Sequence, residues 1–503
     1  MNITVKSGQI QDQAVDLIVV NHFEGMRSPV GATGAVDARL AGAIDEIISA
    51  GDFKGKLNDA LLLYARRQLN ARRVLLIGLG PAAEFTLERA RQVAATAARK
   101  ARELGVKRMA TVVNGASTAG LDVQAAAQSL AEGILLGLYQ FNPHKSKLEP
   151  DANRQIDEVI VVEIDAQKVP AIEAGIKAGR AIAEAVMATR DLVNHPSNFM
   201  TPTDLAEQAR KIVENRPLSL QVLEADEMRA LGMGSLLGVA QGSDTPPKLV
   251  IFEYKPAEAA DKAPLVFVGK GITFDTGGIS IKPAEHMEEM KGDMAGAAAV
   301  FGALQAIADL GLAQHVIGIT PLVENMPSGK AYKPGDVLKA SNGKTIEVIS
   351  TDAEGRLVLA DALVYAGRYN PAAVIDLATL TGACVVALGE DVAAGMFGTD
   401  EALKQKLMAA SDSSSERLWP MPLFDDYKER IKSDTADMKN SGGRYGGVGT
   451  SAIFLREFAE GYPWAHLDVA PMTLSERDRP YTPKGATGFG VRLLVQLARD
   501  WAG

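Results

Sequence analysis

The sequence predicts an α/β protein of two domains, each built on a mostly parallel or mixed sheet that is flanked by helices. Short runs of Val, Ile and Leu alternate along the chain with longer Ala-rich segments, which is typical of strands joined by helices. The 503 residues are 47% hydrophobic, enough for two or three sizeable cores. We expect an N-terminal domain over residues 1–170 and a C-terminal domain over 171–503, in which 171–195 forms a helix that links the two.

The first domain is predicted from four short apolar runs and two Ala-rich segments. The apolar runs predict strands over residues 16–20, 74–77, 110–113 and 159–162. The Ala-rich segments carry their charges on one side and predict helices over 87–104 and 123–139. The polar segment 144–151 predicts a loop. The linking helix that follows should end before Pro196, because proline disfavours helix at the residue that precedes it.

One segment of the first domain has the form of a dinucleotide-binding fingerprint. Gly78, Gly80 and Ala83 follow a predicted strand with the spacing G-x-G-x-x-A. That fingerprint needs a helix that begins at the glycines and an acidic residue at the end of the next strand. Pro81 delays the helix, and Asn114 stands where the acid should be. We therefore do not predict nucleotide binding at this segment.

The second domain shows the same alternation of strands and helices. Apolar runs predict strands over residues 249–253, 265–268, 316–319, 345–350 and 374–377. Helices are predicted over 295–310 and 355–368. The run 265–268 is bounded by proline and glycine, as is typical of a buried strand in an α/β protein.

Charged residues gather directly after the strand 265–268. Lys270, Asp275, Lys282 and Asp293 follow it in a stretch that also contains several glycines. In open α/β sheets, ligands bind at the carboxyl ends of the strands. Glycine lets the backbone turn sharply and approach a bound ion or substrate closely. We interpret this stretch as the centre of a functional site.

A phosphate-binding P-loop is excluded at the same strand end. The segment Val268-Gly269-Lys270 resembles the end of that motif. The motif also needs glycine at its first position and serine or threonine directly after the lysine. The chain has Pro264 and Gly271 at those two places, so the P-loop interpretation fails.

A second acidic stretch follows a predicted strand. Asp352 and Glu354 are joined there by Arg356, in the first turn of a predicted helix. Thr351 and Glu354 also have the spacing of a capping box, so a purely structural role at the helix start is an open alternative. The same alternative holds for Asp293, because Asp often caps a helix such as the one predicted after it.

Composition and charge exclude several classes of protein. The net charge of −9 argues against a surface that binds nucleic acid generally. The start of the chain has no apolar core of the signal-peptide type, and no apolar run reaches membrane-spanning length. The one cysteine, Cys384, cannot form an internal disulfide. We therefore expect a soluble, cytoplasmic protein.

Histidine does not supply a metal-ligand pattern in this sequence. The six histidines are scattered, and none has the spacing of a zinc site. His466 lies in a strand pattern outside the two charged stretches. We interpret it as a hydrogen-bonded structural residue rather than a ligand.

Together, the two charged stretches resemble the leucyl aminopeptidase family, or cytosol aminopeptidase family, of two-metal exopeptidases. The resemblance rests on the segments VGKGITFDTGG (268–278), MKGDM (290–294) and TDAEGRL (351–357). It is continuous from Arg190 to Leu497 and looser before that. The family's signature octet usually begins with Asn, whereas this chain has Ser350, at a position that is not a ligand in the family.

The resemblance implies two divalent metal ions, Mn²⁺ or Zn²⁺, although the oxygen-rich ligand set also suits Mg²⁺. Asp275 and Glu354 would be shared by both ions. Asp352 would complete the ligands of one ion, and Lys270 with Asp293 those of the other. Lysine would have to bind as the neutral amine, although its free pKa is about 10.4. A neighbouring dication makes that deprotonation feasible.

The resemblance also implies the reaction. A metal-bridging hydroxide would attack the first peptide bond and release N-terminal residues, preferably Leu and other apolar ones. Lys282 would stabilise the oxyanion that forms. Arg356 would hold a bicarbonate ion that acts as general base. One metal ion would bind the free α-amine of the peptide substrate, which restricts the action to the amino end.

Two further implications concern specificity and assembly. A loosely matching set corresponds to the family's pocket for the first side chain of the substrate: Met290, Thr379, Gly382, Ala470 and Met472. Ordinary core packing is an open alternative, above all for Met472. The resemblance also implies a homohexamer whose sites face an interior space.

Two other functions fit parts of the sequence. A two-metal phosphoesterase uses similar carboxylate clusters, but it needs basic residues for phosphate, and the cations here already fit the peptidase scheme. A DNA-binding regulator is the alternative from another class, because some bacterial relatives have that second role. It would use the basic cluster Arg66, Arg67, Arg72 and Arg73, for which a solvated surface is the simpler explanation. Salt-dependent retention on DNA would distinguish the two.

Overall fold

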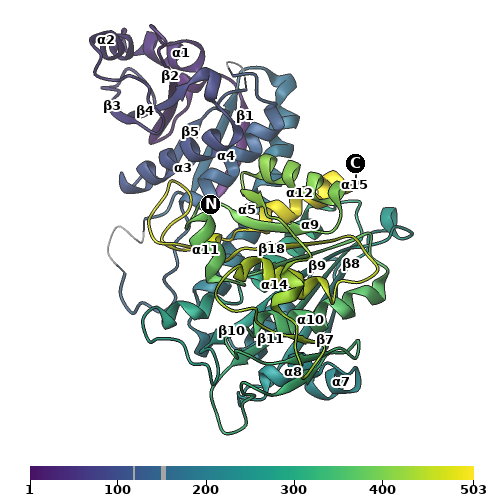
Figure 1. Cartoon of the computed structure of the whole chain (residues 1–503). Coiled ribbons are helices and arrows are strands. Elements are labelled where there is room, and N and C mark those ends of the chain that lie inside the picture. Colours follow the sequence, from purple (N-terminus) through teal and green to yellow (C-terminus); the bar gives the residue numbers. More distant parts are fainter. Residues whose placement is uncertain (117–118, 149–153, 503) are drawn as a thin grey trace. The chain divides into compact units, whose positions relative to one another are not determined.

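The computed structural model describes residues 1–116, 119–148 and 154–502 (Figure 1). The chain forms two compact units, one of Met1–Glu184 with Arg477–Pro483 and one of Ala185–Glu476 with Lys484–Gly503. The long helix α5 (Val169–Asn194) contributes to both units, and the boundary at residue 170 stays a prediction. Residues 149–151 of the predicted loop lie outside the described residues.

In the first unit, the described residues form a six-stranded sheet that is parallel except at one edge. Its strands, in spatial order, are β1 (Asn2–Ser7), β6 (Glu158–Glu163), β5 (Arg108–Thr111), β2 (Leu17–Glu24), β4 (Arg73–Pro81) and β3 (Ala60–Tyr64). Only β3 is antiparallel to its neighbour. The helices α3 (Leu87–Glu103) and α4 (Val123–Gly137) pack against each other. The four strands and two helices predicted for this region are all present.

The two edge strands, β1 and β3, were not predicted. The segment of β1 is short and mostly accessible to solvent, so it has no apolar run. The segment of β3, ALLLY, is rich in leucine, which favours a helix at least as well as a strand. Pairing with β4 decides its conformation, and local propensity does not show that pairing.

The glycines of the fingerprint-like segment serve close packing inside β4. Gly78 and Gly80 lie within the strand, and α3 begins only at Leu87. A Cβ atom at Gly78 would lie 2.0 Å from the carbonyl oxygen of Lys56, so no larger residue fits there. The α-helix does not open at the glycines, in agreement with the sequence argument against dinucleotide binding.

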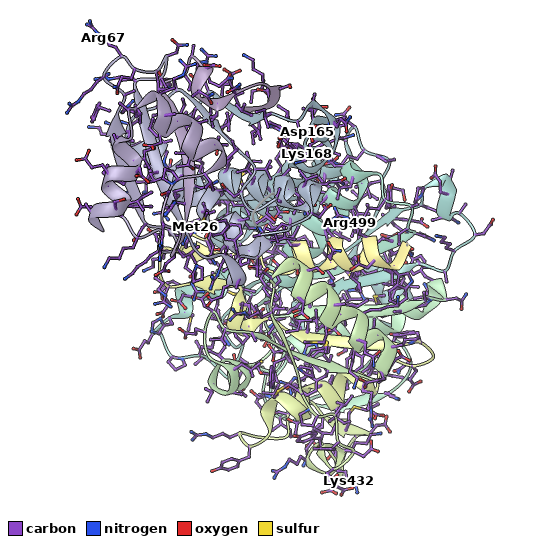
Figure 2. All side chains as sticks on the ribbon, turned by 90° about the horizontal axis from the view of Figure 1, so that it is seen from above. Met26, Arg67, Asp165, Lys168, Lys432 and Arg499 are labelled. Atoms are coloured by element: carbon purple, nitrogen blue, oxygen red, sulfur yellow. The ribbon has the colours of Figure 1, made fainter. Side chains whose placement is uncertain are left out.

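The basic cluster of the first unit lies at the turn between β3 and β4. Arg66, Arg67 and Arg72 are exposed, and Arg73 donates from Nη1 to the carbonyl oxygen of Leu104 at 3.1 Å. Figure 2 shows Arg67 extending from the surface. The exposure of three of these side chains is compatible with the solvated surface expected from the sequence.

In the second unit, the described residues form a nine-stranded mixed sheet. The main path is β16 (Leu418–Pro420), β15 (Ala394–Gly398), β18 (Trp464–Asp468), β14 (Ala373–Ala378), β9 (Leu265–Gly269), β11 (Val316–Asn325), β8 (Lys248–Tyr254) and β7 (Ser219–Leu223). The ninth strand, β10 (Gly271–Asp275), pairs with the end of β11. The four central strands, β18, β14, β9 and β11, are parallel, so their carboxyl ends lie at one edge.

Helices cover both faces of this sheet (Figure 1). On one face, α9 (Ala295–Leu310) packs against β9 and α15 (Val491–Ala502), and Phe301 of α9 meets Phe252 of β8 edge to face. On the other face, α10 (Gly355–Ala366) packs against α8 (Gly234–Ala240) and α14 (Gly447–Arg456). The strands between them are buried on both sides, which is why they appear in the sequence as continuous apolar runs.

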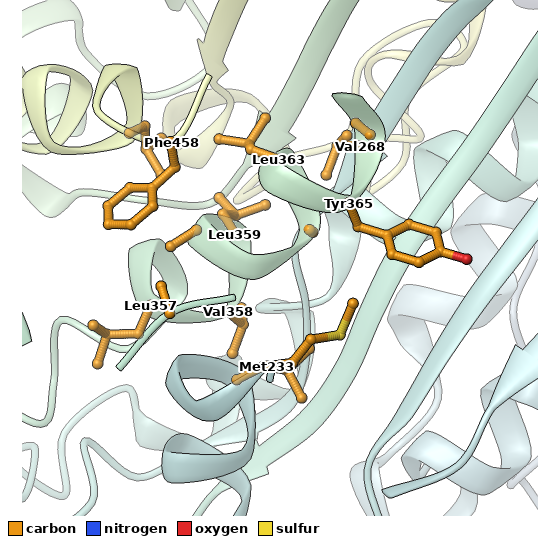
Figure 3. Packing of buried hydrophobic residues seen from close by; sticks show 14 of the residues in the cluster. Met233, Val268, Leu357, Val358, Leu359, Leu363, Tyr365 and Phe458 are labelled. Carbon is orange, nitrogen blue, oxygen red and sulfur yellow. The ribbon is translucent and has the colours of Figure 1, made fainter. Parts of the chain in front are cut away.

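The main core of the second unit lies between α10 and the sheet. Figure 3 shows Leu357, Leu359 and Leu363 of α10 packed among Val268 of β9 and Phe458. All five side chains are essentially inaccessible to solvent. Each such side chain contributes about 1.5–3 kcal/mol by burial, so this core holds the start of α10 firmly against the end of β9.

Shorter elements complete the two units. They are α1 (Gly31–Arg39), α2 (Ala43–Ala50), α6 (Pro202–Val213), α7 (Ala225–Ala230), α8 (Gly234–Ala240), α11 (Gly382–Leu388), α12 (Glu401–Ser414), α13 (Tyr427–Arg430), α14 (Gly447–Arg456), β19 (Leu474–Ser475) and β20 (Gly485–Ala486).

The strand predicted over 345–350 is shorter than expected and lies outside the main sheet. It pairs only as β13 (Thr345–Glu347), between β12 (Val337–Lys339) and β17 (Met438–Lys439) in a small separate sheet. Beyond Glu347, the backbone amide of Ile349 bonds to the side chain of Asn440 instead of a strand. The acidic stretch therefore follows a loop, and not the end of a main-sheet strand.

One helical segment of the second unit is strongly apolar. Met287–Leu310, which includes α9, is long and apolar enough by length and composition to cross a membrane. Within the protein, 89% of its apolar window is buried, as in the core helix of a globular protein. Its apolar character is thus explained by packing against the sheet.

Close packing between α9 and the sheet gives a first prediction. A Cβ atom at Gly296 would lie 2.2 Å from the carbonyl oxygen of Leu377, which is backbone and cannot yield easily. Gly296→Ala should therefore destabilise the protein by about 1–3 kcal/mol, the usual cost of overpacking. Gly329→Ala is the matched control, because nothing lies within 4 Å of its Cβ position. Equal thermal midpoints for the two variants would contradict this packing.

Candidate active site

Lys270 lies at the carboxyl end of β9, directly before β10. Its ammonium group is 3% exposed and lies 2.7 Å from Asp293 Oδ1 and 2.9 Å from Glu354 Oε1. It also donates to the carbonyl oxygen of Thr379 at 2.9 Å. The sequence did not predict β10. Because β10 begins directly after Lys270, this residue stands at the junction of β9 and β10 rather than at the start of a loop.

Asp275 is the last residue of β10 and lies opposite Asn325 in β11. A register shift between Ile272 and Phe274 precedes this pair, an irregularity that re-aims side chains near many functional sites. The Oδ1 atom of Asp275 accepts from the backbone amide of Gly277 at 2.8 Å and from Asn325 Nδ2 at 2.7 Å. Its Oδ2 atom lies 2.9 Å from the ammonium group of Lys282.

Three buried carboxylates converge beside Lys270. Asp275, Asp293 and Glu354 each offer an oxygen, and these oxygens lie within 4.8 Å of one another. Among the described residues, Asp293 Oδ2 and Glu354 Oε2 are buried without a hydrogen-bond partner. Asp352 is 38% exposed and bonds through Oδ1 to Lys282 Nζ at 2.5 Å. A carboxylate oxygen buried without a donor is costly, so these residues fit a divalent cation as the partner of the two oxygens.

The helix-cap alternatives are wrong for these acids. The residue that caps α9 is Met294, and Asp293 instead accepts from the hydroxyl group of Thr379 at 2.6 Å. Glu354 stands at the start of α10 without a side-chain cap bond. The hydroxyl group of Thr351 donates to the carbonyl oxygen of Gly277 at 2.6 Å, so the capping box does not form.

Burial and mutual repulsion shift the pKa values of the acids. Burial raises the pKa of Asp293 to about 8, although Lys270 opposes the shift. Burial and the neighbouring Glu354 raise the pKa of Asp275 to about 6. Burial also acts on Glu354, but Lys270 and Lys282 outweigh it and lower the pKa of that group. Burial and mutual repulsion therefore oppose full ionisation of these carboxylates, and nearby positive charge favours it.

Lys270 and Lys282 supply positive charge beside these carboxylates. Burial disfavours their charged form, yet Asp293 and Glu354 raise the pKa of Lys270 above its ordinary value. In the same way, Asp275 and Glu354 outweigh burial and raise the pKa of Lys282. Gly355 leaves space for the Lys270 side chain, because a Cβ atom at position 355 would lie 2.7 Å from the Lys270 nitrogen.

Arg356 lies in the first turn of α10 and points to the same region. It is 7% exposed and donates from Nη1 to the carbonyl oxygen of Asn440 at 2.9 Å. Its Nε atom is buried and has no partner among the residues that the structure describes. Burial lowers the pKa of Arg356 to about 10, so the guanidinium group remains charged at neutral pH. The positive charge and the buried Nε–H group make Arg356 suited to bind an anion.

The remaining predicted residues take two different places. Met290, Thr379, Ala470 and Met472 are half-buried and Gly382 is exposed, so none has the full burial of a core residue. His466 lies in β18, is buried and pairs through Nδ1 with Asp376 Oδ1 at 2.6 Å. Its position in the sheet agrees with the predicted hydrogen-bonded structural role.

Sequence reasoning missed three polar residues that contact the site. Asn325 bonds to Asp275, Tyr332 donates to the carbonyl oxygen of Thr351 at 2.8 Å, and the Asn440 side chain binds residues 349–353. Asn325 gave one usable signal, since it stands at the end of a long buried strand. Tyr332 lies in an irregular segment and gave none, whereas Asn440 lies in the segment 437–440, which also resembles the family but was given no role at the site.

Buried carboxylates and a lysine beside the strand ends of an α/β sheet fit a divalent-metal site, as in a metal-dependent enzyme. Comparison with known proteins makes this specific. The chain belongs to the cytosol aminopeptidase family: residues 187–495 match the family's catalytic domain, and residues 19–148 match its N-terminal domain. It is therefore a metal-dependent aminopeptidase that acts on peptides.

Similar proteins cover almost the whole chain. The probable cytosol aminopeptidase of Roseiflexus castenholzii is 47% identical over 503 residues, which span 100% of this chain and 99% of the relative. That of Alkaliphilus metalliredigens is 42% identical over 99% of both chains.

Solved structures show the same fold. The bottromycin maturation enzyme BotP in complex with Mn has a TM-score of 0.85 and 34% identity, covering 97% of this chain and 100% of its own. A lysine-to-glutamate mutant of tomato leucine aminopeptidase has a TM-score of 0.88 and 35% identity, covering 99% and 96%.

Proposed function

We propose that this aminopeptidase releases Leu and other apolar residues from the amino ends of peptides at a two-metal centre. The observation that carries the proposal is the pair of buried carboxylate oxygens, Asp293 Oδ2 and Glu354 Oε2, which have no partner among the described residues. They lie beside Asp275 and Lys270 at the carboxyl edge of the sheet. Two divalent ions would satisfy them, and the complex of BotP with Mn supports Mn²⁺, with Zn²⁺ as the alternative.

Five side chains would hold the two ions. Asp275 and Glu354 would be shared, Asp352 would complete one ion's ligands, and Lys270 with Asp293 would complete the other's. Lys270 would lose its proton to become a ligand, because a dication held by Asp293 and Glu354 would offset the negative charge that raises its pKa. When bound, the ions would polarise the scissile carbonyl group and activate the attacking water.

Lys282 and Arg356 would act on the reacting groups without binding an ion. Lys282 is the more accessible of the two lysines, and its ammonium group can turn from Asp352 toward the oxyanion of the substrate. Arg356 would hold a bicarbonate ion through its fork of N–H groups. That ion would take the proton of the attacking water and pass it to the leaving amine.

The proposed substrate pocket uses Met290, Thr379, Gly382, Ala470 and Met472. These residues are half-buried or exposed, which leaves surface for an apolar side chain. The proposal also includes a homohexamer in the cytoplasm that does not bind a membrane.

The second prediction tests this function with a matched pair of peptides. Protein stripped of metal by a chelator should not hydrolyse Leu-Gly-Gly, and added Mn²⁺ or Zn²⁺ should restore release of Leu. N-acetyl-Leu-Gly-Gly should resist hydrolysis under the same conditions, because the free α-amine would itself bind an ion. Chromatography of the products measures both rates.

Either of two results would contradict the proposal. Full activity in rigorously metal-free protein would remove the metal centre from the reaction. Comparable hydrolysis of the acetylated peptide would point to an endopeptidase or a general hydrolase. Leu-Gly-Gly with a D-leucine at its first position is a control, since a free amine alone should not suffice.

A further inference from the structure

Asn325 lies at the meeting point of the two acidic stretches. It is the last residue of β11 and is fully buried, and Asp275 of β10 is its direct pairing partner. Its backbone carbonyl oxygen accepts from the amide of Thr276 at 3.0 Å and from the Thr276 hydroxyl group at 2.8 Å. The backbone of Asn325 thus holds the chain directly after Asp275.

The side-chain amide of Asn325 connects the two stretches. Its Nδ2 atom donates to Asp275 Oδ1 at 2.7 Å and to the carbonyl oxygen of Thr351 at 3.0 Å. Both of its hydrogens are therefore used, one on each stretch. The Thr351 carbonyl oxygen receives a second bond from Tyr332 at 2.8 Å, which occupies both of its lone-pair directions.

The geometry limits which atoms of the acids can face an ion. Oδ1 of Asp275 is occupied by Asn325 and by the amide of Gly277, so only Oδ2 is directed toward Lys282 and the centre of the site. Fixing the carbonyl group of Thr351 fixes the peptide plane that precedes Asp352. Glu354 follows two residues later, so its approach to Asp275 depends on the same anchor.

We propose that Asn325 is a positioning residue of the metal centre. It selects the oxygen of Asp275 that faces the ions and sets the separation between Asp275 and the Asp352–Glu354 segment. The inference rests on the two-metal function proposed above. An amide is required, because a carboxylate would repel both acceptors and an aliphatic group would bond to neither.

The test removes the two bonds but keeps the number and branching of the side-chain heavy atoms. Asn325→Leu should weaken Mn²⁺ binding about 10- to 100-fold, the usual effect of losing a group that orients a metal ligand. Calorimetric titration of metal-free protein with Mn²⁺ measures the affinity and the number of ions. Electron paramagnetic resonance of the loaded protein should also show weaker coupling between the two Mn²⁺ spins, because the shared acids lose their fixed separation.

A buried asparagine of the first unit provides the matched control. Asn114 in the first unit accepts from Asn21 Nδ2 at 2.6 Å and is 6% exposed. Asn114→Leu should lower the thermal midpoint but leave Mn²⁺ affinity and spin coupling unchanged. If Asn325→Leu does not fold, Asn325→Ser carries the same test, because serine is small and cannot reach both acceptors.

The outcomes separate this inference from the proposed function. Wild-type protein that binds two ions, together with an Asn325 variant of equal affinity and equal spin coupling, would overturn the positioning role alone. Wild-type protein that binds no pair of ions would overturn both. A loss of affinity in the Asn325 variant that the Asn114 variant does not share would support the proposal.

Discussion

Glu354→Gln is expected to remove most peptidase activity while the metal-free protein keeps its fold. The side chain of Glu354 is 2% exposed, and glutamine has nearly its volume. No cap bond is lost, because none is made. Lys270 keeps Asp293 and the Thr379 carbonyl oxygen as partners, so the free energy of unfolding should change by less than about 2 kcal/mol.

The loss of activity follows from the ion count. The substitution removes one negative charge and one oxygen ligand from both proposed ion positions, so fewer than two ions per chain should remain. Metal analysis, turnover of Leu-Gly-Gly and thermal melts with and without Mn²⁺ measure the three effects separately. Metal-induced stabilisation should shrink in the variant, since only bound ions stabilise the folded state.

Asp352→Asn provides the companion measurement. Asp352 is partly exposed and pairs with Lys282, so its loss should disturb the fold even less. We expect reduced metal content and low activity here as well. Near-normal metal content and turnover in both variants would show that these acids are not ligands, and the two-metal proposal would have to be abandoned.

Lys282→Ala is expected to lower kcat about a hundredfold or more while two ions remain bound. Loss of one oxyanion donor typically has an effect of that size. The ammonium group of Lys282 lies against Asp275 and Asp352 in this structure, so its removal takes a positive charge away from the ion site. Metal affinity should therefore stay equal or rise. Lys330→Ala, at an exposed lysine of the same unit, is the control.

Arg356→Ala should lower kcat in the same way and should abolish any response of the rate to added bicarbonate. Arg356→Lys keeps the charge but loses the planar fork, so it should recover only part of the activity. Steady-state kinetics with metal analysis of each variant decide the roles. A fall in metal stoichiometry with Lys282→Ala would mean that Lys282 is a ligand.

Much of the fold could be predicted because its strands are buried on both faces. Val268 and its neighbours in β9, or the Val374–Leu377 run in β14, meet helices on both sides, so almost every position is apolar, with Asp376 the exception, and the run is visible. β10 was hidden, because Gly271–Asp275 mixes glycine with polar residues. The strand predicted over 345–350 is too long, because the apolar alternation does not reveal that the backbone amide of Ile349 bonds to the side chain of Asn440.

The sequence by itself predicted the seven metal and catalytic residues, because they lie in two short stretches, the first of which directly follows the buried run of β9. Only the tertiary structure showed that Asp293 and Glu354 make no side-chain cap bond, since a ligand and a helix cap have the same spacing in the sequence. It alone placed Asn325 between the stretches. That contact depends on the pairing of β10 with β11 and on a register shift within it, and such pairing is set by long-range packing rather than by local sequence.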